Sequence, residues 1–154
     1  MDASAVSSTR LPVLFLGHGS PMNVIEDNEF HQGWVRLGQQ FGEGARWPRP
    51  RRILCISAHW MTRGATLVHI GTNPRTIHDF GGFPQALFDM RYPAPGSDGL
   101  VERVAALLGE DRISRDATWG FDHGSWGVLQ PMFPECDVPT VQLSLDRTLG
   151  ADAH

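Results

Sequence analysis

The sequence predicts a layered α/β/α domain built on a central sheet that is largely parallel or mixed. Short apolar runs typical of buried strands alternate with segments of helical periodicity, in the order strand, helix, strand, strand, long loop, helix, loop, strand. The 154 residues suffice for one domain with a hydrophobic core. A hydrophobic content of 41% and a charged content of 19% are ordinary for a globular protein.

The first third of the chain supplies a leader, two strands and a helix. Both strands are short apolar runs, and the helix follows a possible cap at Asp27 or Asn28 and carries apolar residues at helical spacing. The expected elements are a disordered leader over Met1–Arg10, a buried strand over Leu11–Leu16, a helix over Glu29–Gln40 with Phe30, Trp34 and Leu37 on one face, and a second strand over Ile53–Ala58.

The middle of the chain is expected to cross the edge of the sheet. Alternation predicts a third strand over Ala65–Ile70, in which His69 is a solvent-facing or packing residue. Residues 71–92 contain two prolines and a Gly-Gly pair and show few helix signals. A connection of this length without regular structure is often functional, and we expect it to wrap over the carboxyl edge of the sheet.

The last third is expected to complete the layers. Ser97 can cap an amphipathic helix over Asp98–Leu108, which ends at Gly109. The inward side chains of that helix are expected to be Leu100, Val104, Leu107 and Leu108. The remaining expected elements are a short strand over Arg112–Ser114, a short helix over Gly127–Phe133 and a last strand over Val138–Leu145. Only nine residues follow this strand, so we expect a chain truncated at its C-terminus or completed by a partner.

Composition excludes several classes of function. The net charge is -4 and no basic run occurs, so we expect no nucleic-acid partner. No apolar stretch approaches the ~20 residues that cross a bilayer, and the small, polar first ten residues do not resemble a secretory signal. The two cysteines, Cys55 and Cys136, lack Cys-x-x-Cys spacing and are expected to be reduced thiols, which favours a cytoplasmic protein.

Two histidines follow apolar strands in the same way. His18 stands in Gly-His-Gly-Ser-Pro after the first strand, and His59 follows the second. Since ligands of open α/β sheets bind at the carboxyl ends of strands, the pair predicts a site for a divalent metal such as iron or zinc. The alternative is that each is a hydrogen-bonded polar residue at a strand end. Two ligands bind a metal weakly, so a third protein ligand is required.

Two further histidines lie in glycine-rich segments with aromatic residues. His78 precedes Asp79, which could orient an imidazole or cap a turn, and Phe80 and Phe83 could form an apolar wall for a planar ligand or anchor the loop. His123, between Asp122 and Gly124, could carry a proton or donate to a bound anion. A serine-hydrolase motif, Gly-x-Ser-x-Gly, is absent, as are the nucleotide-binding glycine motifs.

Taken together, these segments resemble the class III extradiol ring-cleaving dioxygenases, and among them the 4,5-DOPA dioxygenase branch. The similarity extends from about Leu11 to His154, which would be the amino-terminal part of a single dioxygenase domain over residues 11–154. It is carried by Leu16-Gly-His-Gly-Ser-Pro-Met-Asn23, Ser57-Ala-His-Trp60, Thr76-Ile-His-Asp-Phe-Gly-Gly-Phe-Pro84, Tyr92-Pro-Ala-Pro-Gly96, Trp119-Gly-Phe-Asp-His-Gly-Ser-Trp126 and Val141-Gln-Leu-Ser144.

The resemblance implies an activity and roles for individual residues. It implies cleavage of a catechol ring with O2 by an oxidoreductase of aromatic-compound metabolism that uses Fe(II) or Zn(II). By this resemblance His18 and His59 are metal ligands, His123 is the catalytic acid/base, and His78, Phe80 and Phe83 line the catechol pocket. Family members continue for roughly another hundred residues, which carry further histidines of the metal site, and His154 matches neither of them.

Two other functions remain open from the sequence. One is a truncated, non-catalytic fragment of the family whose metal site is incomplete. The other is a zinc hydrolase that uses the same histidines, which would hydrolyse an ester without taking up O2. The sequence leaves the preferred catechol, the metal and the oligomeric state undetermined.

Overall fold

The structure of the chain is a computed structural model that describes residues 10–154. Its helices are α1 (Glu29–Gly38), α2 (Gln85–Phe88), α3 (Asp98–Leu108) and α4 (His123–Met132), with short 3-10 helices η1 (Pro21–Val24) and η2 (Ala151–Ala153). Its strands are β1 (Ile53–Thr62), β2 (Thr66–His69), β3 (Arg75–Thr76), β4 (Ile113–Asp116), β5 (Gly120–Phe121) and β6 (Thr140–Asp146). Apart from Arg10, the expected leader lies outside the described residues.

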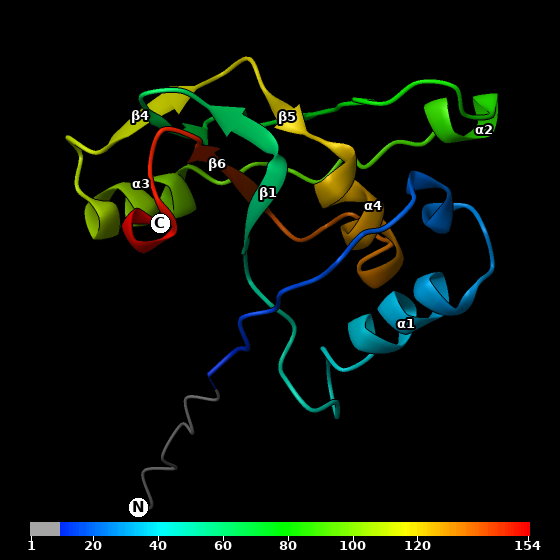
Figure 1. The fold of residues 1–154 in the computed structure, drawn as a ribbon. Helices are drawn as coiled ribbons and strands as arrows, with labels where there is room; N and C mark the ends of the chain where they lie inside the picture. The colour runs from blue at the N-terminus through cyan, green and yellow to red at the C-terminus, as the bar shows by residue number, and fades with distance from the viewer. Residues whose placement is uncertain (1–9) are drawn as a thin grey trace, which may run out of the picture.

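Four strands form a mixed sheet in the order β1-β6-β2-β4, and β3 pairs with β5 in a second, two-stranded sheet. β1 runs parallel to β6 and β2 parallel to β4, whereas β2 and β6 are antiparallel. α3 and α4 lie on either side of β6, and α1 lies against α4 (Figure 1). The predicted layered α/β architecture with a mixed central sheet is therefore confirmed.

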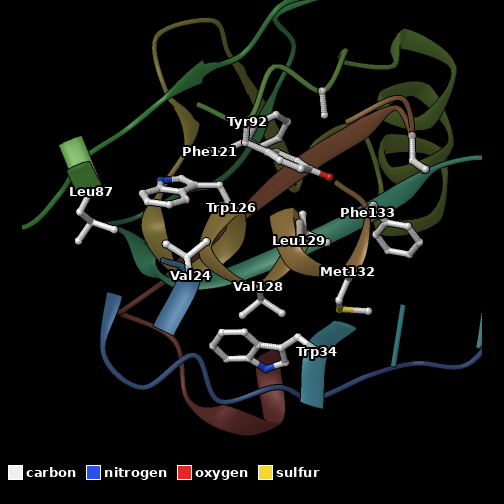
Figure 2. Close-up of a cluster of buried hydrophobic side chains, with 12 residues drawn as sticks. Val24, Trp34, Leu87, Tyr92, Phe121, Trp126, Val128, Leu129, Met132 and Phe133 are labelled. Atoms are coloured by element: carbon white, nitrogen blue, oxygen red, sulfur yellow. The ribbon is translucent and has the colours of Figure 1, made fainter. Parts of the chain in front are cut away.

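Successive side chains of β6 point to opposite faces of the four-stranded sheet, and the two faces carry different residues. Val141 and Leu143 pack against α3, whereas Gln142 points to the other face and contacts Ser125 of α4. The larger core lies on the α4 side, where Trp126, Val128, Leu129 and Met132 of α4 pack with Trp34 of α1. Figure 2 shows Trp34 beneath Val128 in this core. β6 is buried along almost its whole length because it is an inner strand.

The helix over residues 98–108 is confirmed, with the Ser97 cap and the end at Gly109, whose φ is 100°. Two of its expected inward residues are exposed, since Leu107 and Leu108 lie beyond the part of α3 that packs on the sheet. Val101, Val104 and Ala105 fill that interface instead. Leu108 borders a cavity of about 380 Å³ that Ile56 of β1 also lines.

The expected strand over residues 11–16 is wrong. These residues form no helix or strand, and Val13 and Phe15 are fully exposed. Apolar residues form a strand only when their N–H and C=O groups pair with a neighbouring strand, and this segment pairs with none of the strands in the described part of the chain. Leu16 alone packs against the larger core, which brings the following residues to α4.

Two other boundaries differ in a way that matters for the site. β1 continues to Thr62, so His59 lies within the strand and not after it. α4 begins at His123, four residues before the expected start, because the Asp122 side chain accepts a hydrogen bond from the Ser125 N–H and caps the helix. The expected loop over residues 71–92 contains only β3 and α2 as regular elements.

None of the helices in residues 10–154 combines the length and the apolar character needed to cross a membrane. Both cysteines in the described region are free thiols, as expected. Burial raises the pKa of Cys55 to about 11, and its S–H donates to Ser125 Oγ, so Cys55 is a neutral thiol within the core.

The contact between α1 and α4 leads to a stability prediction. A Cβ at Gly38 would lie 2.2 Å from the Met132 carbonyl oxygen, whereas a Cβ at Gly33 of the same helix would have no atom nearer than 4.0 Å. We expect Gly38→Ala to lower the free energy of unfolding by about 2–3 kcal/mol, because backbone would have to separate from backbone. Gly33→Ala should raise it by roughly 0.5–1 kcal/mol, because alanine favours helix. Urea titration measures both, and equal effects would contradict the close approach.

Candidate metal centre

Three imidazoles from three separate parts of the chain converge on one point. His18 comes from the segment before η1, His59 from β1 and His123 from the first turn of α4. One ring nitrogen of each lies within 4.8 Å of the corresponding nitrogens of the others. The His18 and His59 Nε2 atoms are 2.9 Å apart, and the His59 and His123 ring centroids are 4.0 Å apart.

Local backbone structure holds His18 in this position. Gly19 has a φ of 60°, a conformation that a glycine adopts without strain. Ser20 caps η1, and the Asn23 amide donates to the His18 carbonyl oxygen over 3.2 Å. The Gly-His-Gly-Ser-Pro sequence thus forms a turn ahead of a short helix, and this turn directs the imidazole toward β1.

His59 is placed by an irregularity of β1. The parallel register with β6 holds from Ile53 to Ile56 and is shifted when it resumes at Met61, so His59 lies within the interruption. Such interruptions redirect side chains and are frequent beside functional sites. His59 lies on the same face of the strand as Ser57. Both side chains approach Gly124 of α4.

The Asp79 carboxylate joins two of the three imidazoles. Its Oδ1 accepts a hydrogen bond from the His123 backbone N–H and lies 2.8 Å from His123 Nδ1, and its Oδ2 lies 3.3 Å from His59 Nδ1. Each ring therefore presents Nδ1 to the carboxylate, and Nε2 is left for another partner. Carboxylate–imidazole pairs of this kind fix the tautomer and orientation of metal-binding histidines.

Electrostatics favour an ionised Asp79 carboxylate and a neutral His18 imidazole. Burial raises the pKa of Asp79, but hydrogen bonds and the charge of His123 outweigh burial and lower the pKa to about 2. Burial lowers the pKa of His18, and repulsion by His123 and His59 lowers it further. A neutral imidazole is the form that binds a metal ion.

The donor set fits a divalent transition metal. Imidazole nitrogen suits zinc and iron, and neighbouring ligands with bonds of about 2.1 Å lie about 3 Å apart around an ion, which is close to the contact between His18 and His59. His18 Nδ1 is buried and has no hydrogen-bond partner among residues 10–154, so no alternative network in that part of the chain holds this nitrogen. The three nitrogens could hold one ion and leave positions for other ligands.

The other residues singled out in the sequence occupy different positions. His78 lies outside the imidazole cluster, with its Nε2 3.1 Å from the Met90 carbonyl oxygen and its ring against Trp126. The Phe80 ring meets the His123 ring edge-on with centroids 5.5 Å apart, and Phe83 packs against Phe80. Phe80 therefore borders the cluster, whereas Phe83 and His78 lie one contact further away.

Sequence reasoning missed two features of the site. It assigned His123 to proton transfer or to donating a hydrogen bond to a bound anion, and did not place its ring beside His18 and His59. It also left two roles open for Asp79, orienting an imidazole or capping a turn. In the structure Asp79 contacts the imidazoles of His59 and His123, which are 20 and 44 residues away in sequence. The Ser57-x-His59 spacing could have indicated that both side chains lie on one face of β1, because residues two apart in a strand share a face.

Residues 12–151 match the family described as the catalytic LigB subunit of aromatic ring-opening dioxygenase. The chain is 54% identical to the 4,5-DOPA dioxygenase extradiol of Escherichia coli K12 over 150 residues, which are 97% of this chain and 53% of that protein. It is 37% identical to the protein of the same name from Beta vulgaris, over 91% of this chain and 52% of that one.

A solved structure is also similar to about the same part of this chain. The crystal structure of an uncharacterized protein from Escherichia coli K12 superposes with a TM-score of 0.65 at 42% identity, and it covers 86% of this chain and 46% of the other. The chain thus spans about half the length of the relatives that it matches.

Proposed function

This chain belongs to the LigB family of aromatic ring-opening dioxygenases, and from that premise we propose that it is an extradiol dioxygenase that opens a catechol ring with O2. The proposed substrate is a small catechol similar to 4,5-DOPA. The observation that carries this proposal is the convergence of His18, His59 and His123, with Asp79 bound to two of the three rings.

We propose His18 and His59 as ligands of Fe(II) or Zn(II). Bound there, either metal would supply a Lewis acid for the catechol oxygens, and Fe(II) would in addition supply the electron transfer that a reaction with O2 needs. Asp79 keeps the His59 ring turned so that Nε2 faces His18. The hydrogen bond from the Asn23 amide to the His18 carbonyl oxygen holds the backbone that carries the His18 imidazole.

We propose His123 as the acid/base of the reaction. Its Nδ1 faces the Asp79 carboxylate, which orients the ring, and its Nε2 is left to take a proton from a catechol hydroxyl or return one to the opened product. The side chain is only 8% exposed, so bulk water has little access to it. Its position beside the proposed ligands puts it within reach of a molecule bound at the metal.

Aromatic side chains provide a surface for a flat substrate. Phe80 packs edge-on against His123, and Phe83 packs edge-on against Phe80, which extends the apolar surface away from the imidazoles. We propose that both contact the catechol ring. His78 is proposed to support this wall, because its ring touches Phe80 while its Nε2 pairs with the Met90 carbonyl oxygen.

We propose a cytoplasmic location on the basis of the two free thiols and the absence of a membrane-crossing helix from the described region. The proposed partners are the catechol and O2. The net charge of -4 disfavours binding to a polyanion such as nucleic acid.

The test of this function is a ring-cleavage assay on the 154-residue chain loaded anaerobically with Fe(II). We expect O2 uptake that depends on a catechol such as DOPA, with one O2 consumed for each ring opened, and no uptake with a monophenol, because a monophenol lacks the second hydroxyl. Tight metal binding without O2 uptake would favour the non-catalytic fragment. Ester hydrolysis by the zinc-loaded chain without O2 would favour the hydrolase.

A further inference from the structure

Besides Asp79, a second carboxylate, that of Asp122, lies near the imidazoles, in the protein interior. Asp122 is completely buried and caps α4 one residue before His123. Its Oδ1 accepts hydrogen bonds from Ser57 Oγ over 2.7 Å and from the Ser125 N–H over 3.1 Å, and its Oδ2 accepts from Gln142 Nε2. Asp122 therefore connects β1, α4 and β6.

The hydrogen bonds around Asp122 share one direction. On one branch, Cys55 donates to Ser125 Oγ, which donates over 2.8 Å to Gln142 Oε1, and Gln142 in turn donates to Asp122. On the other branch, the His59 backbone N–H donates over 3.1 Å to Ser57 Oγ, which donates to Asp122. Both branches end on the carboxylate, so the network requires an acceptor at this position.

This network is in contact with the imidazole cluster. A Cβ at Gly124 would lie 2.7 Å from His59 Cδ2, 2.9 Å from Ser57 Oγ and 3.2 Å from Asp122 Oδ1. The His59 ring and the Asp122 carboxylate thus close around the same glycine, with no room for a side chain. The backbones that carry His59 and His123 are held together at this point.

The charge of Asp122 has no side-chain counterpart of opposite sign. No arginine or lysine in residues 10–154 forms an ion pair with it. Hydrogen bonds and the amino end of α4 offset part of the cost of burying a carboxylate. The carboxylate also lies close to the site, because Asp122 Oδ1 and His59 Cδ2 would both be within 3.2 Å of a Cβ at Gly124.

We propose that Asp122 is a positioning residue of the metal centre. Through Ser57 it fixes the backbone at His59, through the helix cap it fixes His123, and its buried charge favours a divalent cation at the imidazoles. This inference rests on the metal centre proposed above, and it assigns to Asp122 a role separate from that of Asp79, which contacts the Nδ1 atoms of His59 and His123.

The test compares metal affinities of the 154-residue chain and three variants. Calorimetric titration with Zn²⁺ gives the affinity, and the visible absorption of bound Co²⁺ reports the ligand geometry. We expect Asp122→Asn to weaken binding by about tenfold to a hundredfold and to change the Co²⁺ spectrum. Ser57→Ala, which removes one donor to Asp122 and the acceptor of the His59 N–H, should weaken binding by about threefold to tenfold.

Asp146→Asn is the matched control. Asp146 is also a buried carboxylate at the end of β6, and it accepts hydrogen bonds from Gly64 and Thr148 away from the imidazoles. A purely structural role would lower the melting temperature in both aspartate variants and leave the Zn²⁺ affinity of the folded protein unchanged. We expect the affinity of Asp146→Asn to stay within about twofold of the unmodified chain, since no ligand moves.

Each outcome decides the proposal. If the unmodified chain binds no Zn²⁺, the metal centre fails and the inference with it. If the unmodified chain binds Zn²⁺ and Asp122→Asn binds it equally well, only the inference is overturned. If Asp122→Asn does not fold, Ser57→Ala decides: weaker binding supports the positioning role, and unchanged binding overturns it.

Discussion

Replacement of either His18 or His59 by alanine is expected to abolish tight metal binding by the chain. Each variant loses one of the two proposed nitrogen ligands and with it the 2.9 Å contact between the two Nε2 atoms. We expect the affinity for Zn²⁺ or Fe²⁺ to fall by on the order of a hundredfold or more, since even residues that merely orient a ligand contribute tenfold to a hundredfold. Catechol-dependent O2 uptake should fall to background.

Metal content after dialysis, measured by elemental analysis, checks this expectation. His154→Ala is the control for adventitious binding by surface imidazoles, because His154 is exposed and its Nε2 faces the Asp146 carbonyl oxygen, outside the cluster. That variant should keep its metal. A full complement of metal in both His18→Ala and His59→Ala would refute the proposed centre.

His123→Ala is expected to separate chemistry from metal binding. If His123 transfers the proton and is not a ligand, the variant holds as much metal as the unmodified chain while turnover falls by on the order of 10²–10⁴-fold. His123→Gln should lose the same activity, because an amide can occupy the position beside Asp79 but cannot take up and release a proton near neutral pH. His69→Gln, which changes a buried histidine outside the cluster, should leave turnover unchanged.

The same measurement distinguishes the two roles that the geometry allows His123. Its ring nitrogen is close enough to the other two to act as a third ligand. Loss of metal from His123→Ala, together with loss of activity, would show that His123 is a ligand and that another group moves the proton. Retained metal with retained turnover would exclude both roles.

Much of the fold could be predicted because it depends on local patterns. The helix from Asp98 to Leu108 was correctly bounded, since a serine cap, a 3.6-residue apolar repeat and a glycine end all act within a few residues. The second strand was found from its apolar composition. The expected strand over residues 11–16 failed although its composition is equally apolar, because pairing depends on a partner that composition does not specify.

The sequence by itself determined which side chains could bind a metal, namely His18 and His59, and which aromatic residues could accompany them. Only the tertiary structure decided that His123 joins them, that Asp79 bonds to two rings and that Asp122 lies beneath them. The physical reason is the range of the interactions. The identity of a side chain and the period of a helix or strand are local, whereas hydrogen bonds between residues 44 and 65 positions apart exist only after strands and helices have packed.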